Sequence, residues 1–161
     1  MRRMHPIALG GLVVGVLDIL AAFAVRAAFT GAFRPMLVLQ GIASGLLGPS
    51  AFQGGASTAA LGMALHFLIA FVVAAVYFTA SRRLRVLVRQ PFLYGPIYGV
   101  LVYLVMNQIV LPLSRVNLRT PPMSLVATMI LVHMVFVGLP IALVVSRASK
   151  TLVGARVGQA H

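Results

Sequence analysis

The sequence predicts an all-α integral membrane bundle: four transmembrane helices plus one short re-entrant or interfacial helix, in a single domain covering residues 1–161. Hydrophobic residues make up 61% of the chain and the mean hydropathy is +1.05. Charged residues make up 9%, against about 25% in a typical soluble domain. Four apolar stretches also reach the roughly 20 residues that a helix needs to cross a bilayer.

The net charge of +12 comes from 13 lysines and arginines against one acidic residue. A strongly basic chain can indicate nucleic-acid binding. Here the basic residues lie between the apolar stretches, as charges flanking a membrane do, so we expect lipid and no nucleic acid as a partner. The chain has no cysteine, which excludes disulfides and thiolate metal sites.

The first predicted span, residues 6–25, carries the only acidic residue, Asp18. Gly11, Gly15, Asp18 and Ala22 share one helical face, and small residues let another helix approach closely. A carboxylate near the middle of a membrane costs roughly 2.5–3.5 kcal/mol. We therefore expect Asp18 to point into the bundle, and the stretch to be an uncleaved helix rather than a signal peptide.

The next apolar stretch, residues 36–47, is too short to cross a bilayer. Pro35 suits the first turn of a helix, and Gly48-Pro49 should end it. Gly41 and Gly45 place small residues on one face. These features predict the short re-entrant or interfacial helix.

The remaining predicted spans cover residues 57–80, 91–112 and 123–146. Each contains a strongly polar side chain within its apolar run, namely His66, Asn107 and His133. In the last span, the Gly138-Leu139-Pro140 step predicts a kink. In the third, Gly95 and Gly99 are spaced for close packing against another helix.

Basic residues are distributed unevenly between the two sides of the predicted bundle. One side carries Arg2, Arg3, Arg82, Arg83, Arg85, Arg89, Arg147, Lys150 and Arg156. The other side carries Arg26, Arg34, Arg115 and Arg119. Cytoplasmic segments are enriched in arginine and lysine, so we expect both termini in the cytoplasm of a bacterial cell and the helices in its cytoplasmic (inner) membrane.

Four polar side chains are predicted at a similar depth. With a rise of 1.5 Å per residue, Asp18, His66, Asn107 and His133 each lie roughly 9–15 Å below the outer end of their span. If the small-residue faces meet, these side chains form one buried cluster. The alternative is structural, because a lone intramembrane histidine or asparagine often bonds a neighbouring carbonyl and holds two helices together.

Three chemistries fit the cluster. Asp18 and a histidine that share a proton form a proton relay or a proton-coupled transport site. His66, His133 and Asp18 form a His₂-carboxylate set that suits a divalent metal, Zn²⁺ or Fe²⁺. His66 and His133, on parallel helices, suit the axial positions of a haem b.

A further alternative is a structural accessory subunit of a larger membrane complex. Its docking faces would be the glycine pairs Gly11/Gly15, Gly41/Gly45 and Gly95/Gly99. We expect no enzyme, because the chain has neither a phosphate-binding glycine loop nor a nucleophile elbow, and one acidic residue precludes paired-carboxylate catalysis. Our first interpretation is proton, ion or small-solute transport, for which four spans would have to form a homo-oligomer.

Several short motifs resemble the YagU-like family of bacterial inner-membrane proteins. They are the early His66, the Leu111-Pro112-Leu113 ending, the Thr120-Pro121-Pro122 loop and the early His133. The stretch LQGIASGLLG, residues 39–48, is also similar to shorter bacterial four-helix membrane proteins. The resemblance implies a protein of the cytoplasmic membrane connected with acid tolerance, and it implies no enzyme class.

Overall fold

The computed structural model describes residues 5–117 and 120–157, with side chains described as far as residue 149. Within these ranges all regular structure is helical. Five helices are long and apolar enough to cross a membrane by length and composition: Pro6–Thr30, Pro35–Gln53, Gly55–Arg83, Pro91–Leu113 and Met123–Ser149. The predicted all-α membrane class is therefore confirmed. Arg2, Arg3 and Arg119 lie outside the described residues, as do the side chains of Lys150 and Arg156.

The elements follow one another in a simple order. They are α1 (Pro6–Thr30), α2 (Pro35–Leu47), the 3₁₀ helix η1 (Gly48–Gln53), α3 (Gly55–Arg83), α4 (Val86–Arg89), α5 (Pro91–Val105), the π-helix η2 (Met106–Val110), α6 (Leu111–Leu113), α7 (Met123–Val132), the π-helix η3 (His133–Gly138) and α8 (Leu139–Val157). Thus α5, η2 and α6 form one long helical unit, and α7, η3 and α8 form another.

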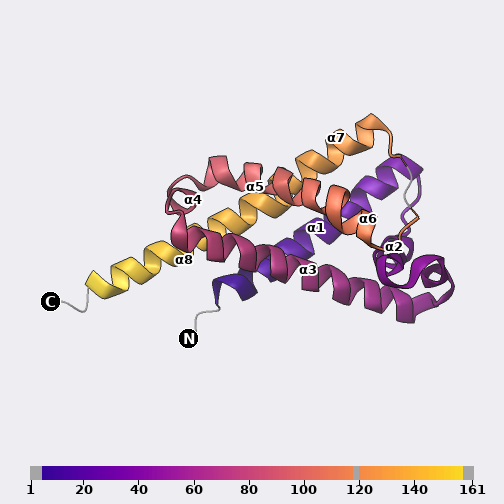
Figure 1. Cartoon of the computed structure of the whole chain (residues 1–161), viewed down its shortest axis with the longest axis horizontal. Coiled ribbons are helices and arrows are strands. Elements are labelled where there is room, and N and C mark those ends of the chain that lie inside the picture. Colours follow the sequence, from indigo (N-terminus) through magenta and orange to yellow (C-terminus); the bar gives the residue numbers. More distant parts are fainter. Residues whose placement is uncertain (1–4, 118–119, 158–161) are drawn as a thin grey trace.

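The long helices run side by side along the longest axis of the molecule (Figure 1). The start of α1, the short α4 and the end of α8 lie at one end. At the other end α1 finishes, α3 begins, and α2 lies between them with its axis nearly along the line of sight (Figure 1). We call these the α4 end and the α2 end of the bundle.

The first helix extends beyond its predicted limit of residue 25 and ends at Thr30. Gly31 terminates it with a left-handed conformation, φ 68°, and its N–H bonds the carbonyl of Ala27. Arg26, which marked the predicted end, lies inside the helix. An arginine does not stop a helix, because its long side chain lets the charge reach polar surroundings while the backbone continues.

The core fills the α4 half of the bundle, where α1, α3, α5 and α8 cross. It consists of Val14, Ala70, Ala74, Tyr77, Val102, Val137, Ile141, Ala142 and Val145. Hydroxyl groups join this core to carbonyls of neighbouring segments: Tyr77 donates to Leu87 at 3.0 Å, and Ser146 donates to Val88 at 2.8 Å. These bonds fasten α3 and α8 to α4.

Glycines set a close helix crossing between α5 and the η3–α8 unit. A Cβ on Gly99 would overlap the carbonyl of His133, and one on Gly138 would overlap the backbone of Gly95. The two backbones therefore touch, which requires residues without side chains at these points. This contact fixes the position of His133 relative to α5.

Both π-helices come two residues before a proline, Pro112 after η2 and Pro140 after η3. Proline has no N–H, and its ring clashes with the carbonyl four residues earlier. That residue is Gln108 in η2 and Phe136 in η3. The wider π turn thus lies where each proline interrupts the helical hydrogen bonding, at the step where the sequence predicted a kink in the last span and an end at residue 112 in the third.

Candidate functional site

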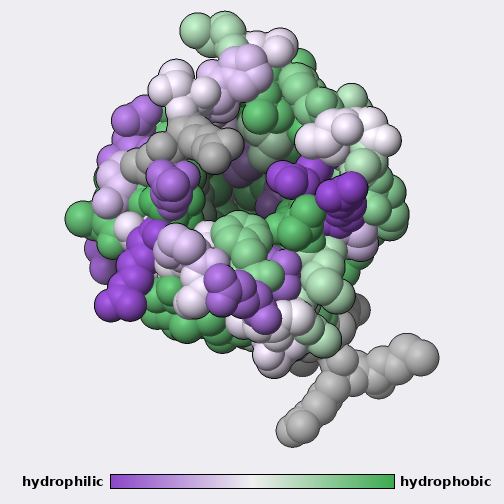
Figure 2. Space-filling view, turned by 90° about the vertical axis from the view of Figure 1, so that its right-hand side faces the viewer, coloured by the Kyte–Doolittle hydropathy of each residue, from purple (hydrophilic) through white to green (hydrophobic). Residues whose placement is uncertain are grey.

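A cavity of about 380 Å³ occupies the middle of the bundle toward the α2 end. Its walls come from α1, α2, α3, α5, η2, α6, α7 and η3, with Pro121 from the loop before α7. All four predicted polar side chains line it, namely Asp18, His66, Asn107 and His133. Figure 2, which looks onto the α2 end, shows a hollow in the centre of this face.

The imidazole of His66 joins α3 to α1. Its Nε2 lies 2.9 Å from the carbonyl oxygen of Gly15. A carbonyl can only accept, so Nε2 carries the hydrogen, and in the neutral ring Nδ1 is the nitrogen with a free lone pair. His66 is therefore a structural link and also a proton acceptor at Nδ1.

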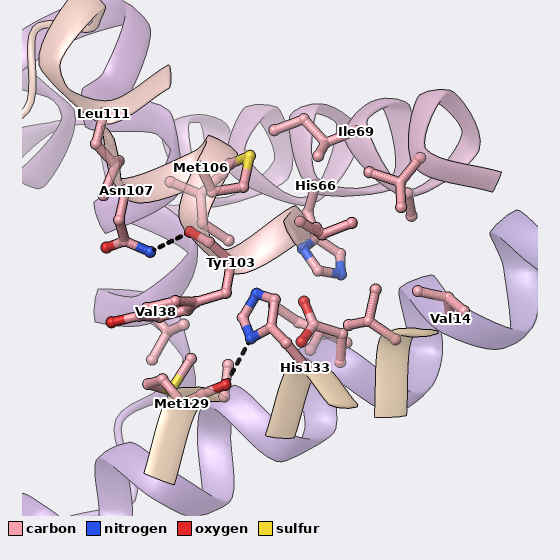
Figure 3. A pocket seen from close by; sticks show the side chains of 18 of the residues that line it. Val14, Val38, His66, Ile69, Tyr103, Met106, Asn107, Leu111, Met129 and His133 are labelled. Carbon is pink, nitrogen blue, oxygen red and sulfur yellow. Dashed lines mark hydrogen bonds between the residues drawn. The ribbon is translucent and has the colours of Figure 1, made fainter. Parts of the chain in front are cut away.

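His133, the first residue of η3, bonds within its own helix. Its Nδ1 donates to the carbonyl of Met129 at 2.8 Å, so Nε2 is the free acceptor. In Figure 3 the rings of His66 and His133 point toward one another from α3 and η3. The two histidines thus carry opposite tautomers, and each keeps one unbonded nitrogen.

The carboxylate of Asp18 has no hydrogen bond or ion pair with any described residue. No buried side-chain oxygen or nitrogen of the described part lacks a partner, so the unpartnered oxygens of Asp18 must be accessible, and Asp18 lines the cavity. The direct Asp–His contact that the sequence led us to expect is not made. The carboxylate and the imidazoles instead line one shared cavity.

Tyr103 also belongs to this site and was missed by the sequence analysis. It is 8% exposed, and its ring packs edge-on against His133 with centroids 5.3 Å apart. Its hydroxyl makes no hydrogen bond to another described residue, and by the reasoning used for Asp18 it is accessible in the cavity. Its spacing offered a signal, since it lies four residues after Gly99 and four before Asn107, on the same helical face.

Asn107 lines the cavity from η2, and its Nδ2 donates to the carbonyl of Tyr103 at 2.9 Å. This bond stays within one helical unit, between residues four apart. One N–H of the Asn107 amide is thus bonded locally, as the structural alternative expects, while its Oδ1 has no partner among the described residues.

The metal and haem alternatives receive no geometric support. In the described part of the chain, no group of three His, Asp or Glu side chains lies close enough to hold a metal ion. For a haem, His66 would have to bind iron through Nδ1, beside its own Cβ, or give up its bond to Gly15. Neither set of residues is arranged for ligation.

Most glycines of the proposed docking faces pack against other helices of the same chain. The faces of Gly11 and Gly15 hold the rings of Phe71 and Phe67 from α3, while Gly95 and Gly99 contact the η3–α8 unit. Gly45 lies against Ser114 and Val116 at ordinary contact distances. Gly41 has open space beside it.

A second, larger space of about 630 Å³ adjoins the cavity and shares with it Val38, Ile42, Met106 and other apolar residues. Its walls come from the last turns of α1, from α2, α3 and α7, and from the η2–α6 unit with the residues that follow it. We call it the lateral groove. Arg26 lines it, and it contains no acidic residue.

The chain was compared with known protein families, curated proteins and solved structures. No protein family, no curated protein and no solved structure matches the chain. The fold and the cavity therefore have to carry the functional interpretation.

Proposed function

We propose that this chain is a membrane transport protein that takes up and releases protons in its central cavity, with Asp18, His66 and His133 as the groups that carry them. The observation that carries this proposal is the convergence of unpartnered polar atoms on one space. A carboxylate from α1, an imidazole from α3 and an imidazole from η3 all line a single cavity of about 380 Å³.

The chemistry follows from the free positions on each group. Nδ1 of His66 and Nε2 of His133 can each accept a proton, which makes the ring cationic. An imidazolium beside a carboxylate is stabilised by the opposite charge, so a proton that enters the cavity lowers the cost of keeping Asp18 ionised. Intramembrane ionisable residues of this kind commonly belong to proton pathways.

We further propose four membrane crossings, with α2 and η1 as a short segment that enters and leaves on one side. Two observations support this topology. Although Pro35–Gln53 as a whole is long enough to span by length and composition, its α-helical part, the 13 residues of α2, extends roughly 20 Å, less than the roughly 30 Å hydrocarbon core. The end of α1 and the start of α3 also lie at the same end of the bundle (Figure 1).

In this topology both termini lie in the cytoplasm of a bacterial cell, and the α2 end faces outward. The excess of arginine at the α4 end, with Arg82, Arg83, Arg85 and Arg89 in one connection, supports that orientation. The segment α2 then covers the outer mouth of the cavity and serves as its gate. We propose a homo-oligomer as the working unit, and the resemblance to YagU-like proteins suggests a role in acid tolerance.

Proton flux measured in proteoliposomes tests the proposal. The full chain is reconstituted with a trapped pH-sensitive dye, and a potassium diffusion potential drives protons inward. We expect flux above that of empty vesicles, and at least a tenfold loss in Asp18→Asn and in His66→Gln. Asp18→Glu keeps the carboxylate and should retain part of the flux.

His5→Gln is the matched control, because His5 lies outside the cavity at the start of α1. It should transport as the wild type does. Equal flux in wild type, Asp18→Asn and empty vesicles would overturn the proposal, and a structural subunit would then be the better interpretation.

A further inference from the structure

The charge of the cavity and the character of its walls specify what it can bind. Asp18 is the only acidic side chain in the whole sequence, and it faces the cavity without a cationic partner among the described residues. When the carboxyl group is ionised and both imidazoles are neutral, the cavity therefore carries one net negative charge. A monovalent cation would complement it.

The walls are a poor match for Ca²⁺ or Mg²⁺. Ca²⁺ and Mg²⁺ require about six or more oxygen ligands, whereas the cavity offers the Asp18 carboxylate, the Tyr103 hydroxyl and the Asn107 amide. Most of the lining is aliphatic, for example Val14, Ile19 and Val102. Such walls stabilise a cation whose charge is attached to an apolar body.

Aromatic and sulfur groups complete the match. Tyr103 and His133, whose rings pack edge-on against each other, line the cavity, and a tyrosine ring attracts organic cations. Met106 and Met129 line both the cavity and the lateral groove, and methionine side chains adapt to ligands of varied shape. The cavity volume also lies within the roughly 300–1,000 Å³ of sites for drug-sized molecules.

We infer that the cavity binds an organic cation with an apolar body, which pairs with the carboxylate of Asp18 and is exchanged for a proton there. This inference rests on the proposed function and names the substrate class of the same site. When the cation binds, the carboxyl group releases its proton to water, and when a proton returns, the neutral carboxyl no longer holds the cation. Only the O–H bond of the carboxyl group forms or breaks.

The lateral groove provides the route. The groove lies beside the cavity near the α2 end and shares wall residues with it. An apolar cation dissolved in the outer leaflet of the bilayer therefore reaches Asp18 without crossing bulk water. Arg26, in the groove, lies eight residues from Asp18, about 12 Å along α1. At that distance it leaves the cavity's own charge negative.

The titratable groups that face Asp18 across the cavity are His66 from α3, Tyr103 from α5 and His133 from η3, while α2 and α7 contribute no titratable side chain to the walls. Protonation of either histidine adds positive charge and opposes the cation. The affinity for the cation should therefore fall as the pH is lowered.

Equilibrium dialysis of the full chain in lipid nanodiscs tests this inference, with radiolabelled tetraphenylphosphonium as the probe. Tetraphenylborate is the matched control, because it has the same shape and the opposite charge. At pH 8 we expect saturable binding of the cation at no more than one per chain, and no saturable binding of the anion. At pH 5.5 binding of the cation should weaken at least tenfold.

Asp18→Asn is nearly isosteric and should weaken binding of the cation at least tenfold, whereas Asp18→Glu should keep part of it and His5→Gln all of it. Saturable binding of both ions, or binding that is unchanged in Asp18→Asn, would overturn the inference. Proton flux without binding of the cation would overturn the inference and leave the proposed function intact. Binding of the cation without proton flux, both in its absence and with the cation added to one side of the vesicles, would contradict the proposed function instead.

Discussion

The two ends of the bundle treat polar side chains in opposite ways. At the α4 end, the hydroxyls of Tyr77, Tyr98 and Ser146 all donate to backbone carbonyls and close the structure. Toward the α2 end, the carboxylate of Asp18 and the hydroxyl of Tyr103 have no partner among the described residues and face a cavity.

The α4 end thus supplies stability, whereas the α2 end holds the cavity that we propose as the functional site. A buried polar group without a partner is costly, so a closed, fully bonded end can support an open end that keeps its polar groups free. Active and binding sites are commonly the places where such groups are left unsatisfied. The comparison can be tested by changing each end separately.

The largest loss of stability should come from Gly138→Leu, at the crossing of α5 with the η3–α8 unit. A side chain here would overlap the backbone of Gly95 and Gly99, which cannot move aside. Overpacking of a core costs about 1–3 kcal/mol and occasionally more, and we expect at least the upper value, seen as loss of the monodisperse peak in detergent. Gly41→Ala has open space and should be as stable as the wild type; equal stability of both variants would argue against the close crossing.

Next comes Tyr77→Phe at the closed end. Tyr77 is 1% exposed, and its hydroxyl is the donor to the carbonyl of Leu87. Removing it leaves a carbonyl without this donor, at a cost of about 1–3 kcal/mol, measurable by reversible unfolding in mixed micelles. Tyr103→Phe removes an unbonded hydroxyl and should change the free energy of unfolding by less than about 0.5 kcal/mol. Similar losses in the two variants would remove the distinction between the ends.

Cysteine labelling compares the solvent access of the two ends. The chain has no cysteine, so each single-cysteine variant reacts without background. Val38 lines the cavity and the lateral groove, whereas Val145 is 1% exposed in the core. A water-soluble maleimide should react at least tenfold faster with Val38→Cys than with Val145→Cys. Comparable rates would mean that water does not enter at the α2 end.

The smallest effect should be that of Asn107→Ala. Asn107 lines the cavity, but its amide bonds a carbonyl of its own helical unit. We expect the affinity for tetraphenylphosphonium to change less than twofold, because the charge of the cavity is unaltered. A loss as large as that of Asp18→Asn would make Asn107 part of the binding site.

Helical periodicity and length were sufficient to predict the long helices and the depth of the polar side chains within them. The apolar runs marked the starts of the long helices closely, whereas α1 and α8 continue beyond their predicted ends at residues 25 and 146, to Thr30 and Val157. The constant rise of a helix placed Asp18, His66, Asn107 and His133 at one depth. These four side chains do line one cavity. The depth of each residue was sufficient for this prediction because successive spans run in opposite directions. The depth of a residue can therefore be counted from the same end of the bundle in every span.

The sequence did not, however, predict the distances across the bundle between side chains that lie at the same depth. The rotation of each helix and the gaps between helices depend on contacts such as Gly99 against the His133 carbonyl. Between α1 and α3, Gly15 packs against the ring of Phe67, and His66 bonds the Gly15 carbonyl, while Asp18 has no bonded partner among the described residues. The contact at Gly99 also brings Tyr103, an ordinary apolar-run residue in the sequence, against His133.

Composition and pattern are therefore sufficient to specify a lipid-embedded helical protein with one acidic residue directed inward, because the bilayer imposes the length and polarity of every span. Whether that carboxylate meets a base or an empty space was decided by how the helices pack. Backbone contacts at three glycines and two π-helices next to prolines set those separations, and such contacts join residues that are distant in the chain.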